Sequence, residues 1–398
     1  MKRKYIFLWC ASFLAAGIFF ASFFEFSLFG GGLFLFLSLM GVLSGRVFGK
    51  TGAVWVCGAL FLYAAGAVRM EMAEEIWRQQ SQYIVGSEGT FCGIVAEEPL
   101  VYKGEDGYAR YLIDLRKIRY ADGEEKSISG TVYLYDFAVE NKYPVGTALE
   151  AEGKLRPLRL YKNPGKIDLE KRYESGHLLG RIYSKENNRI RPAGETGEYR
   201  VTRWAETMRE RLACSFASYM DPVRLPVLMT LLFGGHYSEI PKDIIHSFSV
   251  TGIIHILSVS GSHIALLFGF LYFLGKWLGL SMKVTVFPAV LLVLVYAAMS
   301  GFVPPVIRAS LMGILAVIGV LLERGRTALN LLGAAVAGML LWNPYFLFDI
   351  SFQLSVCASA GILLFYEPLR HAFARLGKIP PRILSLIHIS EPTRLQLI

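Results

Sequence analysis

Motifs for metal binding and for thiol chemistry are lacking in this chain. Its 398 residues include five cysteines, with no Cys-x-x-Cys pair and no Cys/His spacing of the kind that binds zinc. Cys10, Cys57 and Cys357 fall inside apolar runs, so Cys92 and Cys214 are the two left to pair in water. We therefore expect no metal site and no other cofactor, and the sequence leaves a Cys92–Cys214 disulfide open.

Long stretches of the chain also lack charge, which excludes an ordinary soluble globule. Hydrophobic residues make up 54% of the sequence, the mean hydropathy is +0.42, and apolar runs recur with charged loops between them. The fold class predicted from this pattern is a polytopic α-helical membrane protein. The net charge of +9 has two candidate sources, the basic excess of cytoplasmic loops and a basic binding surface.

Three apolar runs open the chain, at about 5–24, 28–45 and 52–70, and form the expected N-terminal transmembrane domain, residues 1–70. No small-residue cleavage site stands out after the basic start, so we expect uncleaved helices. The segment GRVFGKT at residues 45–51 is one residue shorter than a phosphate-binding loop and lies between membrane spans. We expect it to be a short basic cytoplasmic loop.

Residues 71–198 show a different pattern, with a period of two. Short alternating runs such as 111–116 and 131–135 are separated by Gly/Asp turns, including Asp122-Gly123. This pattern is typical of hairpins in an antiparallel sheet. About five strands in little more than a hundred residues predict a small OB-like β-barrel inserted between two membrane blocks.

The later part of this β domain is rich in basic side chains with aromatic rings between them. Cations neutralise phosphates and rings stack on bases, so the composition suits a single-stranded nucleic acid; a solvated basic face is the alternative. Lys171, Arg172 and Tyr173 continue the pattern. The candidate DNA-binding residues are Lys154, Arg156, Arg159, Tyr161, Lys162 and Lys166.

Residues 199–222 predict an amphipathic helix. An apolar side chain recurs at every fourth position, while the charged side chains lie away from this stripe. We expect the helix to lie in the membrane interface; the alternative is that it packs under the β domain. The apolar stripe consists of Trp204, Met208, Leu212, Phe216 and Met220.

A second membrane block is expected within residues 223–384. Its loops alternate between basic ones and ones without lysine or arginine, around Gly301 and Asn343. By the positive-inside rule, this count and the basic N-terminus agree on a cytoplasmic N-terminus and an extracytoplasmic β domain, in the cell (inner) membrane. The apolar runs lie at about 251–275, 284–300, 304–322, 328–347 and 350–369.

The first of these runs carries polar side chains at membrane depth. Polar groups there usually face a protein interior or a water-filled path. Gly261 lies among them and can break the helix. The polar residues are His255, Ser258, Ser260, Ser262 and His263.

Arg308 is the cation near the start of the span at 304–322, three positions after Pro305. Asp349 and Gln353, one turn apart at the start of the last span, are candidates to pair with it. The alternative for all these polar residues is a hydrogen-bond network that only holds the helices together.

Several segments resemble the competence domain of ComEC-type DNA-uptake proteins. They are LMTLLFGGHYSEIP, GIIHILSVSGSHIALL, GFVPPVIRASLMG and WNPYFLFDISFQLSVCASAGILLF, and the upstream NPGKIDLEKRYESGH is similar to the end of the family's extracytoplasmic barrel-like domain. The resemblance implies an inner-membrane channel that imports single-stranded DNA during natural transformation, a transport protein and not an enzyme. It also implies a lipid bilayer, a competence DNA receptor and a cytoplasmic DNA translocase motor as partners; a homo-oligomer is left open.

The resemblance assigns the family's motifs to particular residues of this chain. The His-x-x-x-x-Ser-Gly-x-His motif falls on His255, Ser260, Gly261 and His263. The Pro-Pro-x-x-Arg motif falls on Pro304, Pro305 and Arg308, and the Asp-x-x-x-Gln motif on Asp349 and Gln353. Ser262 stands where many members have a glycine.

The C-terminal end departs from the family. Many members continue into a metallo-β-lactamase-like domain, and its His/Asp cluster is lacking in this sequence. Residues 385–398 do not continue a span, and we expect them to be a non-native tail on a truncated reading frame.

Two other functions fit the membrane pattern. One is an intramembrane metal-dependent hydrolase that uses His255, His263 and Asp349 as ligands; the lack of His-Glu-x-x-His weakens it. The other is a small-molecule or lipid transporter with a site at a broken helix.

Overall fold

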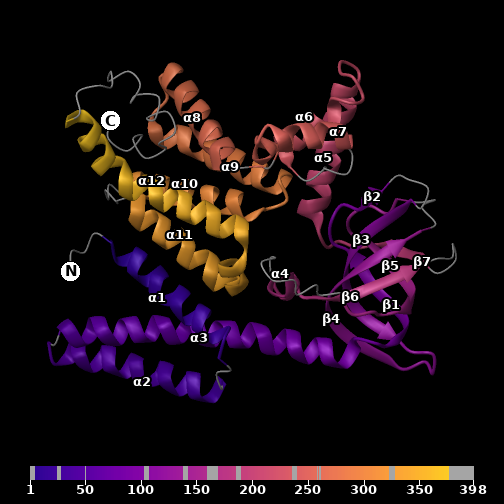
Figure 1. The fold of residues 1–398 in the computed structure, drawn as a ribbon, viewed down its shortest axis with the longest axis horizontal. Coiled ribbons are helices and arrows are strands. Elements are labelled where there is room, and N and C mark those ends of the chain that lie inside the picture. The colour runs from indigo at the N-terminus through magenta and orange to yellow at the C-terminus, as the bar shows by residue number, and fades with distance from the viewer. Residues whose placement is uncertain are drawn as a thin grey trace. The chain divides into compact units, whose positions relative to one another are not determined.

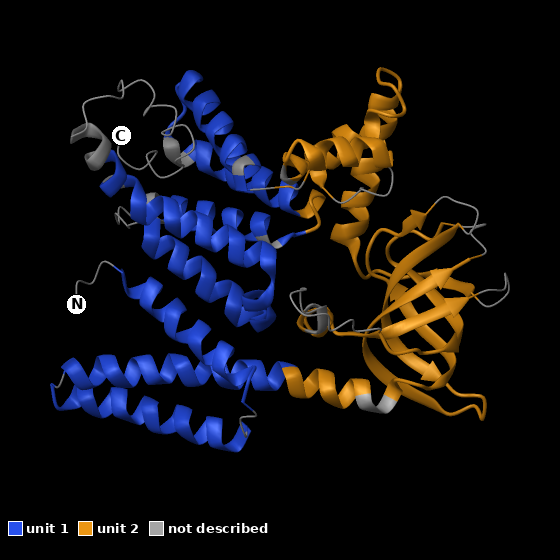
Figure 2. Cartoon of the chain, viewed as in Figure 1, with its two compact units in different colours: residues 1–73, 260–297, 302–398 blue, residues 74–259, 298–301 orange. Residues whose placement is uncertain are grey.

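The computed structural model describes residues 5–24, 28–49, 51–102, 107–137, 142–158, 169–184, 190–234, 240–257, 259, 261–321 and 328–375. Two compact units make up the chain (Figure 2). Unit 1 contains residues 1–73, 260–297 and 302–398, and unit 2 contains residues 74–259 and 298–301. The boundary at 259/260 therefore falls inside the expected span at 251–275.

Unit 1 is built from helices (Figure 1). They are α1 (Ile6–Ala21), α2 (Leu28–Val47), α3 (Thr51–Ile84, whose last residues belong to unit 2), α8 (Gly261–Trp277), α9 (Met282–Met299), α10 (Pro304–Leu321), α11 (Ala328–Trp342) and α12 (Ile350–Arg375). A short 3₁₀ helix, η4 (Pro344–Phe348), joins the last two. Its core includes Ile18, Met70, Leu332 and Leu340.

Close packing of α1 against α3 and α11 depends on glycine. A Cβ at Gly17 would overlap the carbonyl of Tyr63, and one at Gly66 would overlap the carbonyl of Leu14. Gly333 of α11 lies as close to the backbone of Leu8. Small residues that let backbones approach are typical of helix contacts in membranes, where burial of apolar surface gives little driving force.

Two of the described helices, α2 and the part of α3 at 51–81, are long and apolar enough to cross a membrane. Shorter apolar helices cover 6–21, 263–277, 284–299, 305–318, 328–342 and 350–366. Many large apolar side chains of these helices are exposed, among them Phe29 at 83% and Trp342 at 82%. The predicted apolar runs therefore form helices, although the third run continues to Ile84 as one helix of 34 residues.

The expected single span at 251–275 is wrong as one helix. A 3₁₀ helix, η3, covers Ile254–Leu257, and α8 starts only at Gly261. The break lies where the sequence places Gly261 among polar residues, which offer the backbone other hydrogen-bond partners than a helix does.

A seven-stranded mixed sheet dominates unit 2. Its strands are β1 (Glu88–Val95), β2 (Leu100–Tyr102), β3 (Tyr108–Arg119), β4 (Glu125–Asp136), β5 (Thr147–Lys154), β6 (Leu178–Ser184) and β7 (Ile190–Glu195), in the order β6-β4-β3-β1-β5-β7, with β2 on β3. The pair β4/β6 is parallel and the other pairs are antiparallel. Just after β5, Arg156 bridges to Arg181 of β6.

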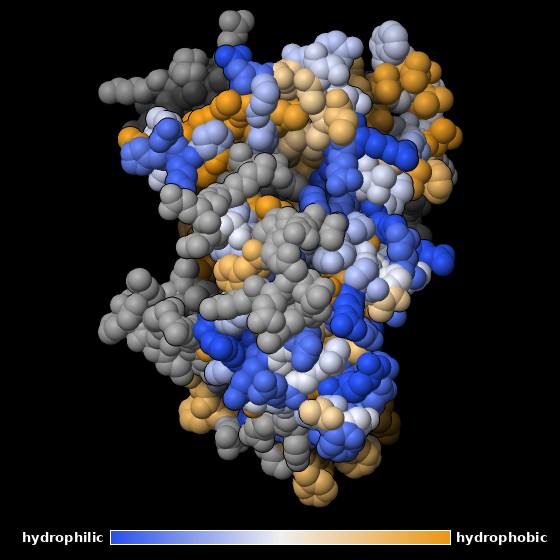
Figure 3. All heavy atoms as spheres, turned by 90° about the vertical axis from the view of Figure 1, so that its right-hand side faces the viewer, coloured by the Kyte–Doolittle hydropathy of each residue, from blue (hydrophilic) through white to orange (hydrophobic). Residues whose placement is uncertain are grey.

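The predicted hairpin at Asp122-Gly123 is confirmed. β3 and β4 pair across it, Gly123 has a positive φ of 87°, and the Asp122 carboxylate accepts a hydrogen bond from the Glu124 amide. Alternate residues of both strands are buried, as the period of two requires. The core of this sheet includes Phe91, Tyr111 and Leu134, whereas hydrophilic side chains prevail over the strands in the lower half of Figure 3.

Unit 2 also contains the helices α4 (Leu169–Ser175), α5 (Arg200–Ala217), α6 (Leu225–Phe233) and α7 (Lys242–Val250). The charged side of α5 packs on the β domain. Arg203 forms two hydrogen bonds of 2.7 Å to Glu195. Arg209 donates a hydrogen bond to Glu98, and the buried Glu206 accepts one from the Val145 amide. Trp204, which belongs to the predicted apolar stripe of α5, is 41% exposed. The helix thus packs on the β domain through its charged side, and the position of its apolar side in the membrane interface stays a prediction.

Candidate functional site

Arg308 is held inside the helical unit by neutral groups. It lies in the first turns of α10, where Pro304 at the helix start costs no hydrogen bond, and it is 8% exposed. Its Nε donates to the Ser355 hydroxyl at 2.7 Å and its Nη1 to the Ser359 hydroxyl at 2.8 Å, both on α12. Met312 Sδ lies 3.4 Å from Nη1. None of these three partners carries a negative charge.

The start of α8 approaches the other side of the same guanidinium. A Cβ at Gly261 would lie 3.3 Å from Arg308 Nη2 and 3.4 Å from the Cβ of Ala309. A Cβ at 261 would thus need only a small shift of its neighbours, whereas a larger side chain would meet the guanidinium. The sequence alone indicated both residues but not that they meet.

The expected pairing of Arg308 with Asp349 or Gln353 is wrong. Asp349 precedes α12 and accepts a 2.8 Å hydrogen bond from the Phe352 amide, while Gln353 donates to the Leu347 carbonyl at 2.7 Å. Both side chains close the turn around η4 and the start of α12. Helix α12 instead presents Ser355 and Ser359, two and six residues after Gln353, to Arg308.

The two histidines of the motif fall in different units. His263, on the first turn of α8, stacks with Tyr296 of α9, with ring centroids 6.3 Å apart. His255 lies in η3, and its side chain, like those of Ser262 and Pro304, lies outside the described residues. Ser258 and Ser260 lie outside them altogether. Among the described residues, no group of three or more His, Cys, Asp or Glu side chains is placed to hold a metal ion.

Two of the candidate DNA-binding residues, Lys154 and Arg156, are exposed at the end of β5 and just beyond it. Arg159, Tyr161, Lys162, Lys166 and the tail 385–398 lie outside the described residues. Lys171 does not belong to the basic face: its ammonium lies 2.5 Å from Glu74 and 3.2 Å from Glu174. These carboxylates raise its pKa against the opposing effect of burial.

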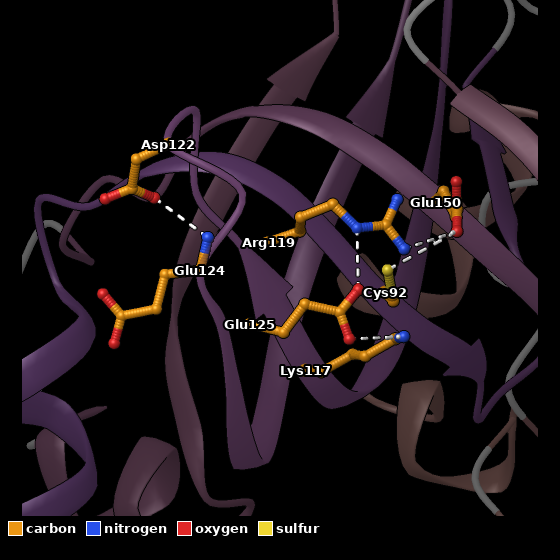
Figure 4. Close-up of polar contacts among 7 residues, drawn as sticks. All are labelled: Cys92, Lys117, Arg119, Asp122, Glu124, Glu125 and Glu150. Carbon is orange, nitrogen blue, oxygen red and sulfur yellow. Dashed lines mark hydrogen bonds and ion pairs between the residues drawn. The ribbon is translucent and has the colours of Figure 1, made fainter.

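A pocket of about 510 Å³ opens on the β domain beside Cys92, Lys117, Glu125 and Glu150. Glu125 bonds Arg119 at 2.8 Å and Lys117 at 3.0 Å, and these bonds lower the pKa of the Glu125 carboxyl (Figure 4). Burial, together with Glu150, raises the pKa of the Cys92 thiol. The thiol is therefore unreactive at neutral pH, and Glu125 already binds Lys117 and Arg119.

All five cysteines are free, so the Cys92–Cys214 disulfide left open above does not form in this structure. The residues that sequence reasoning missed are Ser355 and Ser359. Their spacing of four places both hydroxyls on one face of α12, and that spacing was a signal for a shared partner. The partner itself could not be identified from the spacing.

Comparisons with known proteins agree with the motifs. Residues 231–396 match the family model described as Competence protein. The chain is 25% identical to ComE operon protein 3 of Bacillus subtilis (strain 168) over 61% of its own length and 30% of the relative's. It is 36% identical to an uncharacterized protein of Aquifex aeolicus (strain VF5) over 34% of the chain and 32% of that protein.

A third relative, the uncharacterized protein YcaI of Escherichia coli (strain K12), is 24% identical over 46% of the chain and 25% of its own length. The chain thus spans about a third or less of the length of these relatives. No solved structure matches it. The family match at residues 231–396 and the similarity to ComE operon protein 3 support a ComEC-type competence protein.

Proposed function

We propose that this chain belongs to an inner-membrane conduit that imports single-stranded DNA during natural transformation. The observation that carries the proposal is Arg308, a buried cation whose described partners are hydroxyls and a thioether. A buried charge without a counter-charge attracts an ion of opposite sign. Along a path for a polyanion, it binds phosphate, and its single charge allows release.

The proposed architecture is a multi-pass membrane protein with an extracytoplasmic OB-like barrel. Closely packed helices with exposed apolar side chains support the first part. The second part is supported by the order β1-β3-β4-β6, the parallel pair β4/β6, and the Arg156–Arg181 bridge, which joins the end of β5 to β6 and so links the two sides of the sheet. In this architecture the β domain receives DNA at the outer face.

The two alternatives have less support. A metal-dependent hydrolase needs converging ligands, and the described part of the chain brings no three His, Cys, Asp or Glu side chains together in that way. A transporter for small molecules or lipids shares the broken segment before α8, but the basic residues Lys154 and Arg156 have no role in it. We therefore propose transport of DNA, with no enzymatic step in this chain.

The test is binding of a single-stranded oligonucleotide to the whole chain in lipid nanodiscs, over a series of salt concentrations. Bound phosphates release counterions, so affinity should fall steeply as salt rises. The double variant Lys154→Glu, Arg156→Glu should bind more weakly and with a shallower salt dependence. A control with the same charge change on other strands, Lys126→Glu with Arg191→Glu, should bind nearly as the unaltered chain does. Salt-independent binding, or equal loss in both variants, would contradict a DNA contact at this end of β5.

A further inference from the structure

Aromatic side chains form a continuous cluster on the outer side of the β domain. In β4 and β6 the side chains alternate between the core and the outside, and Tyr135 and Tyr183 are outside, beside the buried Leu134 and Ile182. We call this cluster the ring surface. Its members are Tyr102 of β2, Tyr108 of β3, Tyr135 of β4, Phe137 just after β4, and Tyr183 of β6.

Neighbouring strands place these rings next to one another. Tyr102 pairs with Tyr108 in the β2/β3 register, and their ring centroids are 4.7 Å apart. Tyr135 pairs with Tyr183 in the parallel β4/β6 register, at 5.0 Å. Tyr108 joins the two pairs, since its ring lies 5.6 Å from both Tyr135 and Phe137. The rings are only half-buried or exposed, so they add little to the core they border.

Arginines border the ring surface. The guanidinium carbons of Arg156 and Arg181 lie 5.6 Å and 5.5 Å from the centre of the Tyr183 ring. Arg110 pairs with Tyr135 in the β3/β4 register and lies 4.8 Å from the centre of the Tyr133 ring. No ion pair involves these three arginines among the described residues. Their charge is therefore available to an anion that lies along the rings.

We propose that the ring surface binds single-stranded nucleic acid, with bases stacked on the tyrosines and phosphates on Arg110, Arg156 and Arg181. Exposed rings interleaved with guanidinium groups combine the two attractions that a single strand offers, π faces and phosphates. In duplex DNA the faces of the bases are already stacked, so the same surface discriminates against it. The inference rests on the proposed function and locates the contact on β2, β3, β4 and β6, beyond the basic segment that follows β5.

The charge of the surface argues against other occupants. An apolar protein partner would leave the three arginines without counter-charges, which is costly once they are buried at an interface. A lipid headgroup would bind the arginines but would offer the tyrosine rings no aromatic group to stack on. A single strand satisfies both sets of groups.

The experiment separates bases from phosphates. The whole chain in nanodiscs is titrated at fixed salt with a thymidine oligonucleotide, with an abasic oligonucleotide of the same length, and with a duplex. Stacking on an aromatic side chain strengthens binding by roughly five-fold or more per base, so the thymidine strand should bind at least that much more tightly than the abasic strand. Tyr135→Leu with Tyr183→Leu should remove this preference, because leucine keeps apolar bulk without a ring. Tyr135→Phe with Tyr183→Phe should retain it, and so should Tyr219→Leu, at a tyrosine 89% exposed outside the sheet.

Each result either supports or overturns the inference that the ring surface binds single-stranded nucleic acid. Equal affinity for the thymidine and abasic strands overturns the ring surface, and so does a preference for the duplex; in either case a steep salt dependence in the separate salt series of the proposed function leaves that function standing. A preference that survives in the leucine variant places stacking elsewhere and also overturns the inference. If none of the three nucleic acids binds, the inference and the DNA contact in the proposed function fail together.

Discussion

The guanidinium of Arg308 on α10 lies beside Gly261 at the start of α8, so that a Cβ at position 261 would be 3.3 Å from Nη2. Gly261 and Arg308 belong to separate motifs, 47 positions apart in the sequence, yet they are neighbours in unit 1. The same guanidinium reaches α12 through Ser355 and Ser359. Changes at these four positions should therefore be coupled, which leads to the first two predictions.

Replacing Gly261 by leucine should stop DNA import while membrane-inserted protein stays near its normal level. The added side chain displaces Arg308 Nη2 and obstructs the break before α8. Gly269→Leu is the matched control, since it lies on the same helix with no atom within 4 Å of its Cβ position, and it should import DNA normally. Imported labelled DNA and inserted protein are measured in the same transformable cells. Loss of import only in proportion to lost protein would indicate a packing role, and normal import with leucine at 261 would contradict a conduit there.

Removing both hydroxyls that hold Arg308, with Ser355→Ala and Ser359→Ala, should destabilise the helical unit by about 1 to 3 kcal/mol. The cost arises because a buried cation loses two hydrogen bonds. Ser310→Ala is the control: Ser310 on α10 is 5% exposed and thus more buried than Ser355 and Ser359, but its hydroxyl has no hydrogen-bond partner among the described residues. Equilibrium unfolding of the purified protein in mixed detergent measures the difference. An equal effect of both changes would show that the Arg308 contacts contribute nothing specific.

The stability of the β domain should depend on the ionisation of Glu206. Burial raises the pKa of this carboxyl above its ordinary value of 4.5. In the pH window between the ordinary and the raised pKa, the folded protein binds more protons than the unfolded chain, so this contribution to stability is lost as pH rises. Glu206→Gln should therefore raise the midpoint of thermal unfolding more at pH 8 than at pH 5. Glu210→Gln, one turn further along α5 at a side chain that is 57% exposed, is the control for the loss of a carboxylate from this helix.

The orientation in the membrane is tested by single cysteines in a chain whose five natural cysteines are replaced by serine. Ala121 is exposed in the β3/β4 turn, and Phe48 is exposed between α2 and α3. With the β domain outside, Ala121→Cys should react with an impermeant thiol reagent in intact cells, and Phe48→Cys only after lysis. The reverse pattern would contradict both the orientation and the access of the β domain to incoming DNA.

Local patterns in the sequence were sufficient to predict individual helices and strands. Apolar runs became α1, α2, α9 and α10 with ends close to those expected, because the backbone hydrogen bonds of a helix are made within one segment and depend on its local composition. The alternation in 111–116 and 131–135, with Asp122-Gly123 between, predicted the β3/β4 hairpin for the same reason: a turn and its two strands are neighbours in the chain. The sequence also singled out Gly261 and Arg308, which lie near each other in the structure.

Only the tertiary structure shows which residues distant in sequence contact each other. Lys171 is neutralised by Glu74, 97 residues away, and Arg308 takes serines of α12 in place of Asp349 and Gln353. The ring surface draws on four strands whose order and register place Tyr135 beside Tyr183. A local pattern predicts which side chains point away from the core, because that depends on the period of two along one strand. It does not predict which strands become neighbours in the sheet, because that depends on how the whole chain buries its apolar surface.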